Sequence, residues 1–168
     1  MGGGYPCCCG PNTGQDCCAC DACDVPDEIT VTIAGYTPGV SFPWVGGCEL
    51  NGTWVLPYFN CQGVQGAPTG NFCNSGVDEQ FGVFALYTDN FTVSGCTFSF
   101  GVLIGRDHWL STTGKMFIYG SILGPSFYQL KFCYVDPSDL DCRGKTGLSA
   151  TIEFNSGSTT PTVTIDLP

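Results

Sequence analysis

The chain has 168 residues, which is the length of about one domain and is sufficient for a hydrophobic core of its own. Hydrophobic residues make up 43% of the chain and aromatic residues 13%, which excludes an intrinsically disordered protein. The formal net charge of −10, with only 5 Lys and Arg, excludes a basic surface for nucleic acid and disfavours binding to anionic membranes.

The surface is expected to carry few charges, because Asp, Glu, Lys and Arg together make up only 12% of the chain. Typical soluble domains contain about 25% of these residues. A surface so poor in charge favours a protein whose faces are covered by neighbours. The first residues contain neither a basic segment nor an apolar run, so no signal peptide is recognisable. No apolar stretch approaches the ~20 residues of a membrane-spanning helix.

Residues 1–26 consist mainly of Gly, Pro, Cys and Asp, which predicts an irregular N-terminal arm ahead of a β domain over residues 27–168. Seven of the 13 cysteines lie in this arm: Cys7, Cys8, Cys9, Cys17, Cys18, Cys20 and Cys23. Their two overlapping C-x-x-C spacings suit a structural zinc site. Disulfides are favoured slightly over zinc, and because seven is odd they leave a thiol that stays free, joins the body or bridges to another subunit. An iron–sulfur or redox role is disfavoured, since the thioredoxin-like setting of a redox C-x-x-C is missing.

The first strand of the body is predicted over residues 28–34, where Ile and Val alternate with Thr. Residues 48–59 are predicted to form a hairpin that turns at Asn51-Gly52, because this dipeptide favours tight turns.

Two aromatic hairpins are predicted next. One covers residues 80–100 and turns at Asp89-Asn90, and the other covers residues 115–135 and turns at Gly124-Pro125.

The chain closes with strands over residues 148–154 and 162–167. The whole pattern contains about nine or ten short strands separated by Gly, Pro, Asn and Asp, with no amphipathic helix. It predicts an all-β protein, with an antiparallel β-sandwich or jelly-roll-like body.

Six further cysteines are spread over this body, where we expect disulfides or buried thiols: Cys48, Cys61, Cys73, Cys96, Cys133 and Cys142. Cysteines that flank one turn can form a bridge if their Cα atoms come within about 7 Å. This favours Cys48–Cys61 and Cys133–Cys142, which leaves Cys73–Cys96. The alternative is that several of the six are reduced thiols in the core.

No enzyme is expected. The single histidine, His108, lies near Ser111, but no nucleophile-elbow motif accompanies it. Asp136, Asp139 and Asp141 have the close spacing of calcium ligands, although the glycine and terminal glutamate of an EF-hand are absent, so a solvated turn is favoured.

Aromatic side chains could form a sugar-stacking face, with Trp54 and Trp109 as its main candidates. Aromatic residues at alternating strand positions belong more often to a core, which is the favoured alternative. Asn51 and Asn90 each begin an N-glycosylation pattern, and a turn role explains Asn51 better.

The segments ITVTIAG (29–35) and CELNGTWVLPY (48–58) resemble uncharacterised cysteine-bearing β-sandwich modules of phage structural proteins and environmental bacteria. The CCC and CCxC segments of the arm are similar in style. This resemblance implies a structural role in a virion or on a surface, and it carries over no catalytic residues.

These features predict a structural assembly subunit, such as a virion component (phage head, tail or fibre) or an extracellular filament. Its N-terminal arm would be cross-linked by disulfides or zinc. The expected partners are copies of the chain and other assembly proteins, and the expected location is a virion or an extracellular surface. The alternative is a secreted β-sandwich module that binds glycan or protein.

Overall fold

The chain is seen here in a computed structural model, which describes residues 25–36, 48–65, 81–93, 95–106, 116–125, 128–136, 142–156 and 160–168. Nearly all of these residues lie in antiparallel strands, which confirms the all-β class. The strands are β1 (Glu28–Ala34), β2 (Gly52–Gln65), β3 (Phe81–Val93), β4 (Cys96–Arg106), β5 (Met116–Leu123), β6 (Gln129–Asp136), β7 (Lys145–Ser149), β8 (Thr151–Asn155) and β9 (Thr162–Leu167).

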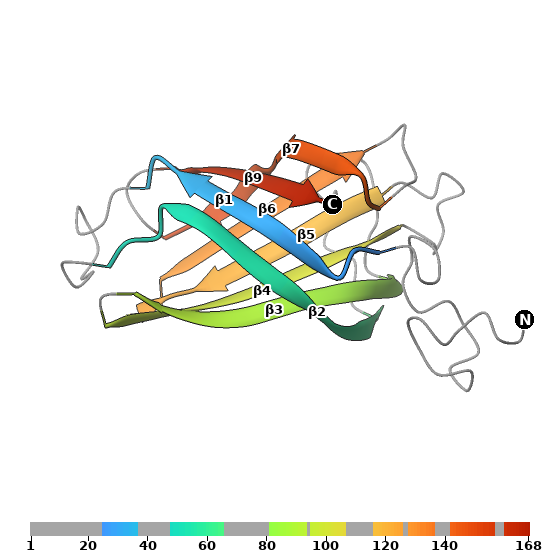
Figure 1. Ribbon diagram of the computed structural model, residues 1–168, viewed down its shortest axis with the longest axis horizontal. Helices are drawn as coiled ribbons and strands as arrows, with labels where there is room; N and C mark the ends of the chain where they lie inside the picture. Colours follow the sequence, from blue (N-terminus) through green and yellow to red (C-terminus); the bar gives the residue numbers. More distant parts are fainter. Residues whose placement is uncertain are drawn as a thin grey trace, which may run out of the picture.

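All of these strands belong to one 9-stranded sheet in the order β7-β9-β1-β2-β3-β4-β5-β6-β8. Strands β1 to β5 each pair with the next strand along the chain, so that β1 to β6 form a meander (Figure 1). The neighbours that are not consecutive in the chain, β7-β9, β9-β1 and β6-β8, are the crossovers of this order. Strands β7 and β8 lie at opposite edges of the order, yet only Ala150 separates them in the chain.

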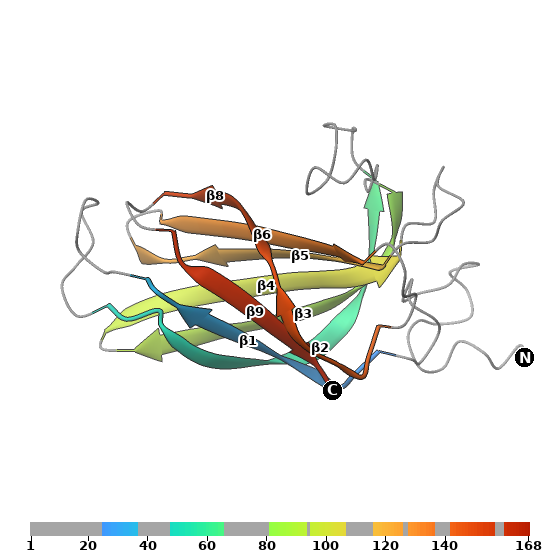
Figure 2. The same cartoon turned by 90° about the horizontal axis from the view of Figure 1, so that it is seen from above.

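The sheet therefore curls until its two edges meet at one bent segment (Figure 2). The Ala150 N–H donates a hydrogen bond of 2.9 Å to the Val163 carbonyl of β9 where the chain passes from β7 to β8. The result is a nearly closed, barrel-like sheet whose interior holds the core.

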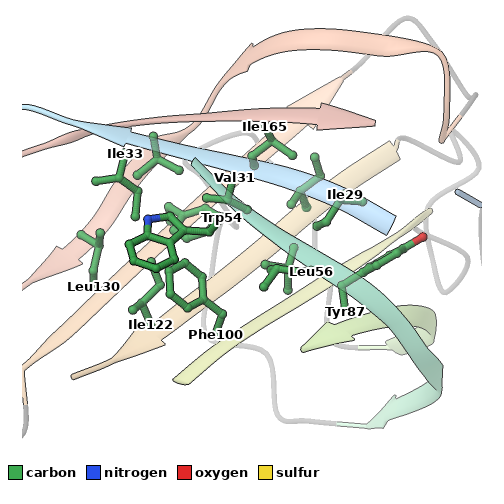
Figure 3. Close-up of a cluster of buried hydrophobic side chains, with 14 of the residues drawn as sticks. Ile29, Val31, Ile33, Trp54, Leu56, Tyr87, Phe100, Ile122, Leu130 and Ile165 are labelled. Atoms are coloured by element: carbon green, nitrogen blue, oxygen red, sulfur yellow. The ribbon is translucent and has the colours of Figure 1, made fainter. Parts of the chain in front are cut away.

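The alternation predicted for residues 28–34 is confirmed, because Ile29, Val31 and Ile33 of β1 are all buried. They face apolar side chains of β2 and β9, including Leu56 and Ile165 (Figure 3). Burying one side chain of this size contributes about 1.5–3 kcal/mol, so this alternation does much to fix which face of the strand points inward.

Trp54 of β2 lies within the same core, with 8% of its surface exposed. Its ring centroid lies 5.1 Å from that of Phe91 and 5.4 Å from that of Phe100. The indole N–H donates a hydrogen bond of 2.9 Å to the Leu50 carbonyl, so its one polar group is satisfied inside the protein.

The predicted hairpin over residues 48–59 is wrong. From Gly52 to Gln65 the chain is one strand of 14 residues, which pairs with β1 on one side and with β3 on the other. Asn51 makes no turn: its side-chain amide donates to the Tyr36 carbonyl at 2.7 Å, and its oxygen accepts from the Tyr36 N–H at 2.8 Å.

The predicted turn at Asp89-Asn90 is also wrong, because β3 continues to Val93, which pairs with Cys96. Gly95 has a φ of 80°, a conformation that favours glycine, so the turn falls there. The turn at Gly124-Pro125 is confirmed, and the Gly124 N–H closes it with a hydrogen bond of 2.9 Å to the Tyr128 carbonyl.

Candidate functional site

The body has two ends (Figure 2). We call them the arm end, where the chain enters β1, and the bridge end, where the Cys48–Cys96 disulfide lies. At the arm end, β1 begins at Glu28, β6 ends at Asp136 and β7 begins at Lys145. At the bridge end, β1 ends at Ala34 and β4 begins at Cys96. Because Val25, Pro26 and Asp27 directly precede β1, the N-terminal residues join the body at the arm end.

The junction with the N-terminal residues is fixed to the body by two hydrogen bonds. The buried Tyr87 hydroxyl of β3 donates to the Pro26 carbonyl at 2.7 Å. The Tyr58 N–H of β2 donates to the Asp27 carbonyl at 2.8 Å. These two bonds connect the junction directly to β2 and β3.

One disulfide is located at the bridge end, where it joins Cys48 to Cys96 with a Cα–Cα distance of 5.5 Å. Both residues are buried, and the bond ties the segment before β2 to the first residue of β4. The predicted pairs Cys48–Cys61 and Cys73–Cys96 are therefore wrong. The physical reason is the length of β2, because Cys61 lies nine residues beyond Gly52, or about 30 Å along an extended strand.

Cys133 and Cys142 are also disulfide-bonded. Cys142 belongs to the main core, whereas Cys133 belongs to a second cluster on the outer face of the sheet. The two cysteines thus belong to different clusters, and the predicted bridge between them stays a prediction. All four cysteines whose side chains the structure describes are oxidised, so the reduced-thiol alternative is wrong for these four.

The second cluster is built on the outer face of β3 to β6, toward the arm end. Phe84 and Phe117 meet there with their ring centroids 4.7 Å apart, although β4 lies between their strands. The residue of β4 beside Phe117 is Gly105, which has no side chain to keep the rings apart. Phe84, Phe117 and Cys133 are each at most 2% exposed, so this outward face is covered.

Many predicted site residues lie outside the residues that the structure describes, and their roles stay predictions. They are the arm cysteines Cys7, Cys8, Cys9, Cys17, Cys18, Cys20 and Cys23, together with Cys73, His108, Trp109, Asp139 and Asp141. For Cys61 and Asp136 only the backbone is described. Within the described ranges, no group of three or more His, Cys, Asp or Glu could hold a metal ion. Those ranges contain no helix with the length and apolarity of a membrane span.

Two buried tyrosines form a polar cluster at the bridge end. The rings of Tyr36 and Tyr128 meet edge to face, with centroids 5.6 Å apart, and the Tyr128 hydroxyl donates to Asn155 at 2.8 Å. Burial raises the pKa of Tyr128 to about 12. Burial, then the Tyr128 phenol and the Glu49 carboxylate, raise the pKa of Tyr36 as well. Both phenols therefore keep their protons at neutral pH, as structural groups do.

The proposed sugar-stacking face loses one of its main members, because Trp54 is buried in the core. The exposed apolar side chains of β2 are on its opposite face: Val55 is 42% exposed and Phe59 63% exposed, with the exposed Pro57 between them. The sequence shows that Val55, Pro57 and Phe59 alternate with Trp54 and Leu56 and therefore share one face of the strand. Which of the two faces is buried depends on how β1 and β3 pack beside β2, and the sequence of β2 does not show that.

The fold and the bridges define a class: an all-β body, cross-linked by disulfides, that carries an N-terminal cysteine-rich segment. Comparison with protein-family models, with curated proteins and with solved structures found no match to this chain. The resemblance of residues 29–58 to phage and environmental modules stays a prediction.

Proposed function

We propose that the chain is a structural subunit of an assembly, either a virion component such as a phage head, tail or fibre protein, or an extracellular filament. The body supplies a rigid unit, and the N-terminal arm cross-links it to a neighbouring molecule through disulfides or zinc. Its location is a virion or an extracellular surface.

The observation that carries this proposal is the state of the cysteines. All four described cysteine side chains are in disulfides, which is typical of proteins that mature in an oxidising environment. The chain has 13 cysteines, and because this number is odd, disulfides within one chain leave at least one cysteine over. A bond to a second molecule, or a metal, would use it.

The position of the arm supports the same proposal. The junction at Pro26 and Asp27 is hydrogen-bonded to β2 and β3, so a cross-link made by the arm holds the whole sheet and not a loose segment. The low content of charged residues, 12%, suits faces that are covered by neighbours.

The test is electrophoresis and native mass spectrometry of the purified chain, with and without reductant and chelator. We expect covalent multimers that reductant dissolves, or zinc-bound multimers that a chelator dissolves. Replacing the seven arm cysteines by Ser should abolish them, whereas the control variant Cys48→Ser/Cys96→Ser should keep them. A monomer with free arm thiols and no bound metal would overturn the proposal.

A further inference from the structure

Strand β2 presents an apolar row to solvent, which we call the β2 stripe and define as Val55, Pro57 and Phe59. The same strand buries Trp54 and Leu56 on its inner face, so the stripe is the outward half of a regular alternation. Phe59 is 63% exposed, the largest exposure among the large hydrophobic side chains that the structure describes. An aromatic side chain held in water is unfavourable for a molecule that acts alone.

The pairing of β2 with β3 is irregular at Phe59. Tyr58 pairs with Tyr87, and the next pair is Asn60 with Leu86, so Phe59 has no opposite residue and forms a β-bulge. A bulge bends its strand and locally interrupts its ladder of hydrogen bonds. Here it follows Pro57, which a central strand tolerates only beside such an irregularity.

The surroundings of the β2 stripe are acidic. Glu28 of β1 pairs with Pro57, and the Asp27 carbonyl accepts the Tyr58 N–H at 2.8 Å, so two exposed acidic residues stand beside the stripe. Neither of the two strands that flank β2, β1 and β3, contains a Lys or an Arg. The net charge of the whole chain is −10.

We propose that the β2 stripe is a docking surface for a segment of another protein that presents an apolar side chain flanked by Lys or Arg. The apolar side chain covers Phe59 and Val55, and the basic groups face Asp27 and Glu28. A second copy of this chain fits poorly, because its own stripe has the same acidic border and its net charge is repelled. The inference rests on the proposed assembly role and names the surface and the partner chemistry for it.

The probe is a synthetic peptide of alternating Lys and Leu, titrated into the isotope-labelled full chain and followed by NMR amide shifts. We expect shifts that are confined to β1 and β2 and that weaken as salt is added, because part of the attraction is between charges. A matched peptide of alternating Glu and Leu should leave the spectrum unchanged.

Variants locate the contact. Phe59→Ser should weaken peptide binding by at least about tenfold, as loss of an aromatic anchor does, and Glu28→Gln should weaken it by a smaller factor. The matched control is Phe154→Ser, because Phe154 of β8 is 48% exposed and lies on another strand. This control should bind the peptide as the native chain does. Melting curves of each variant serve as the check that it is folded.

Three results would overturn the inference: equal binding of both peptides, shifts outside β1 and β2, or equal losses in Phe59→Ser and Phe154→Ser. Concentration-dependent shifts at the stripe without peptide would identify a second copy as its occupant and would overturn it too. If the chain stays monomeric but binds the Lys-Leu peptide, only the proposed cross-linked assembly is overturned. If the chain forms multimers but does not bind the peptide, only the proposed docking surface is overturned.

Discussion

At the scale of single residues, Gly120 and Phe132 fit closely together in the sheet. Gly120 of β5 pairs with Phe132 of β6, and a Cβ atom at Gly120 would overlap the phenyl ring. The ring therefore lies over the bare backbone of the glycine and fills the space that a side chain would take. The side chain of Phe132 is itself fully buried.

Gly120→Ala is expected to lower the free energy of unfolding by about 1–3 kcal/mol, because the added methyl group overpacks a filled core. The measurement is urea unfolding with the disulfides intact. Gly101→Ala is the matched control, since a Cβ atom at Gly101 of β4 meets nothing within 4 Å. The control should change stability little or raise it slightly. Equal losses in the two variants would show that a general cost of replacing strand glycines, and not the ring, is responsible.

The tyrosine cluster predicts how stability depends on alkaline pH. In the folded chain the pKa of Tyr128 is about 12, raised from 10.0, so the folded state favours the neutral phenol. The contribution to stability is complete below pH 10.0 and is lost as the pH rises toward about 12, because the unfolded chain ionises first.

Tyr128→Phe should flatten this alkaline loss, because it removes one of the two raised pKa values. At neutral pH it should cost about 1 kcal/mol, for the hydrogen bond to Asn155. Unfolding curves at a series of pH values test this, with the ultraviolet absorbance of tyrosinate as a second signal. An unchanged slope in the variant would mean that other groups cause the alkaline loss.

At the scale of elements, strand identity could be predicted from the sequence better than turns could. The alternation in residues 28–34 and 162–167 reflects one buried and one open face, which is a property of the strand itself. Asn51-Gly52 and Asp89-Asn90 both have turn-forming composition. Yet β2 begins at Gly52, and β3 runs through Asp89 and Asn90, because neighbouring strands supply hydrogen-bond partners at these positions. Local composition does not contain that information.

The same limit applies to the candidate sites. The bulge at Phe59 depends on the register between β2 and β3, and the partner of Cys48 depends on where β4 begins. Both are relations between segments that lie far apart in the chain. The spacing of the cysteines therefore led to the prediction of Cys61, and not Cys96, as the partner of Cys48. The number of cysteines and their positions along the chain can be read directly from the sequence, because neither depends on how strands pair.

The bridge at Cys48 and Cys96 closes a loop of 48 residues that contains β2 and β3. A disulfide that closes a loop of this length stabilises by about 2–4 kcal/mol, mainly by restricting the unfolded chain. Cys48→Ser/Cys96→Ser should therefore lower the melting temperature without changing the β-sheet circular dichroism of the folded state. The single variant Cys48→Ser should lose at least as much stability, since it also leaves an unpaired thiol at Cys96. A double variant as stable as the native chain would contradict a stabilising role for this bond.

At the scale of the whole molecule, the sheet depends on one bent segment for its closure. The two edges of the strand order, β7 and β8, are held together through Ala150, and the Ala150 N–H bonds to Val163 of β9. The strand order gives β7 and β8 one neighbouring strand each, β9 and β6, and strands at the edge of a sheet invite pairing with other chains. In the proposed assembly, closure of the sheet would disfavour edge-to-edge aggregation, so that the arm and the β2 stripe would make the contacts.

Ala150→Pro tests this role of the bent segment, because proline has no N–H to donate to Val163. We expect a loss of stability of about 1–3 kcal/mol and faster hydrogen exchange in β7, β8 and the facing part of β9. Ala150→Ser keeps the N–H and should behave as the native chain does. Faster exchange spread evenly over β1 to β6 would mean that the substitution weakens the whole core. Faster exchange confined to β7, β8 and β9, together with aggregation that rises with concentration, would show that Ala150 closes the sheet and protects its edges.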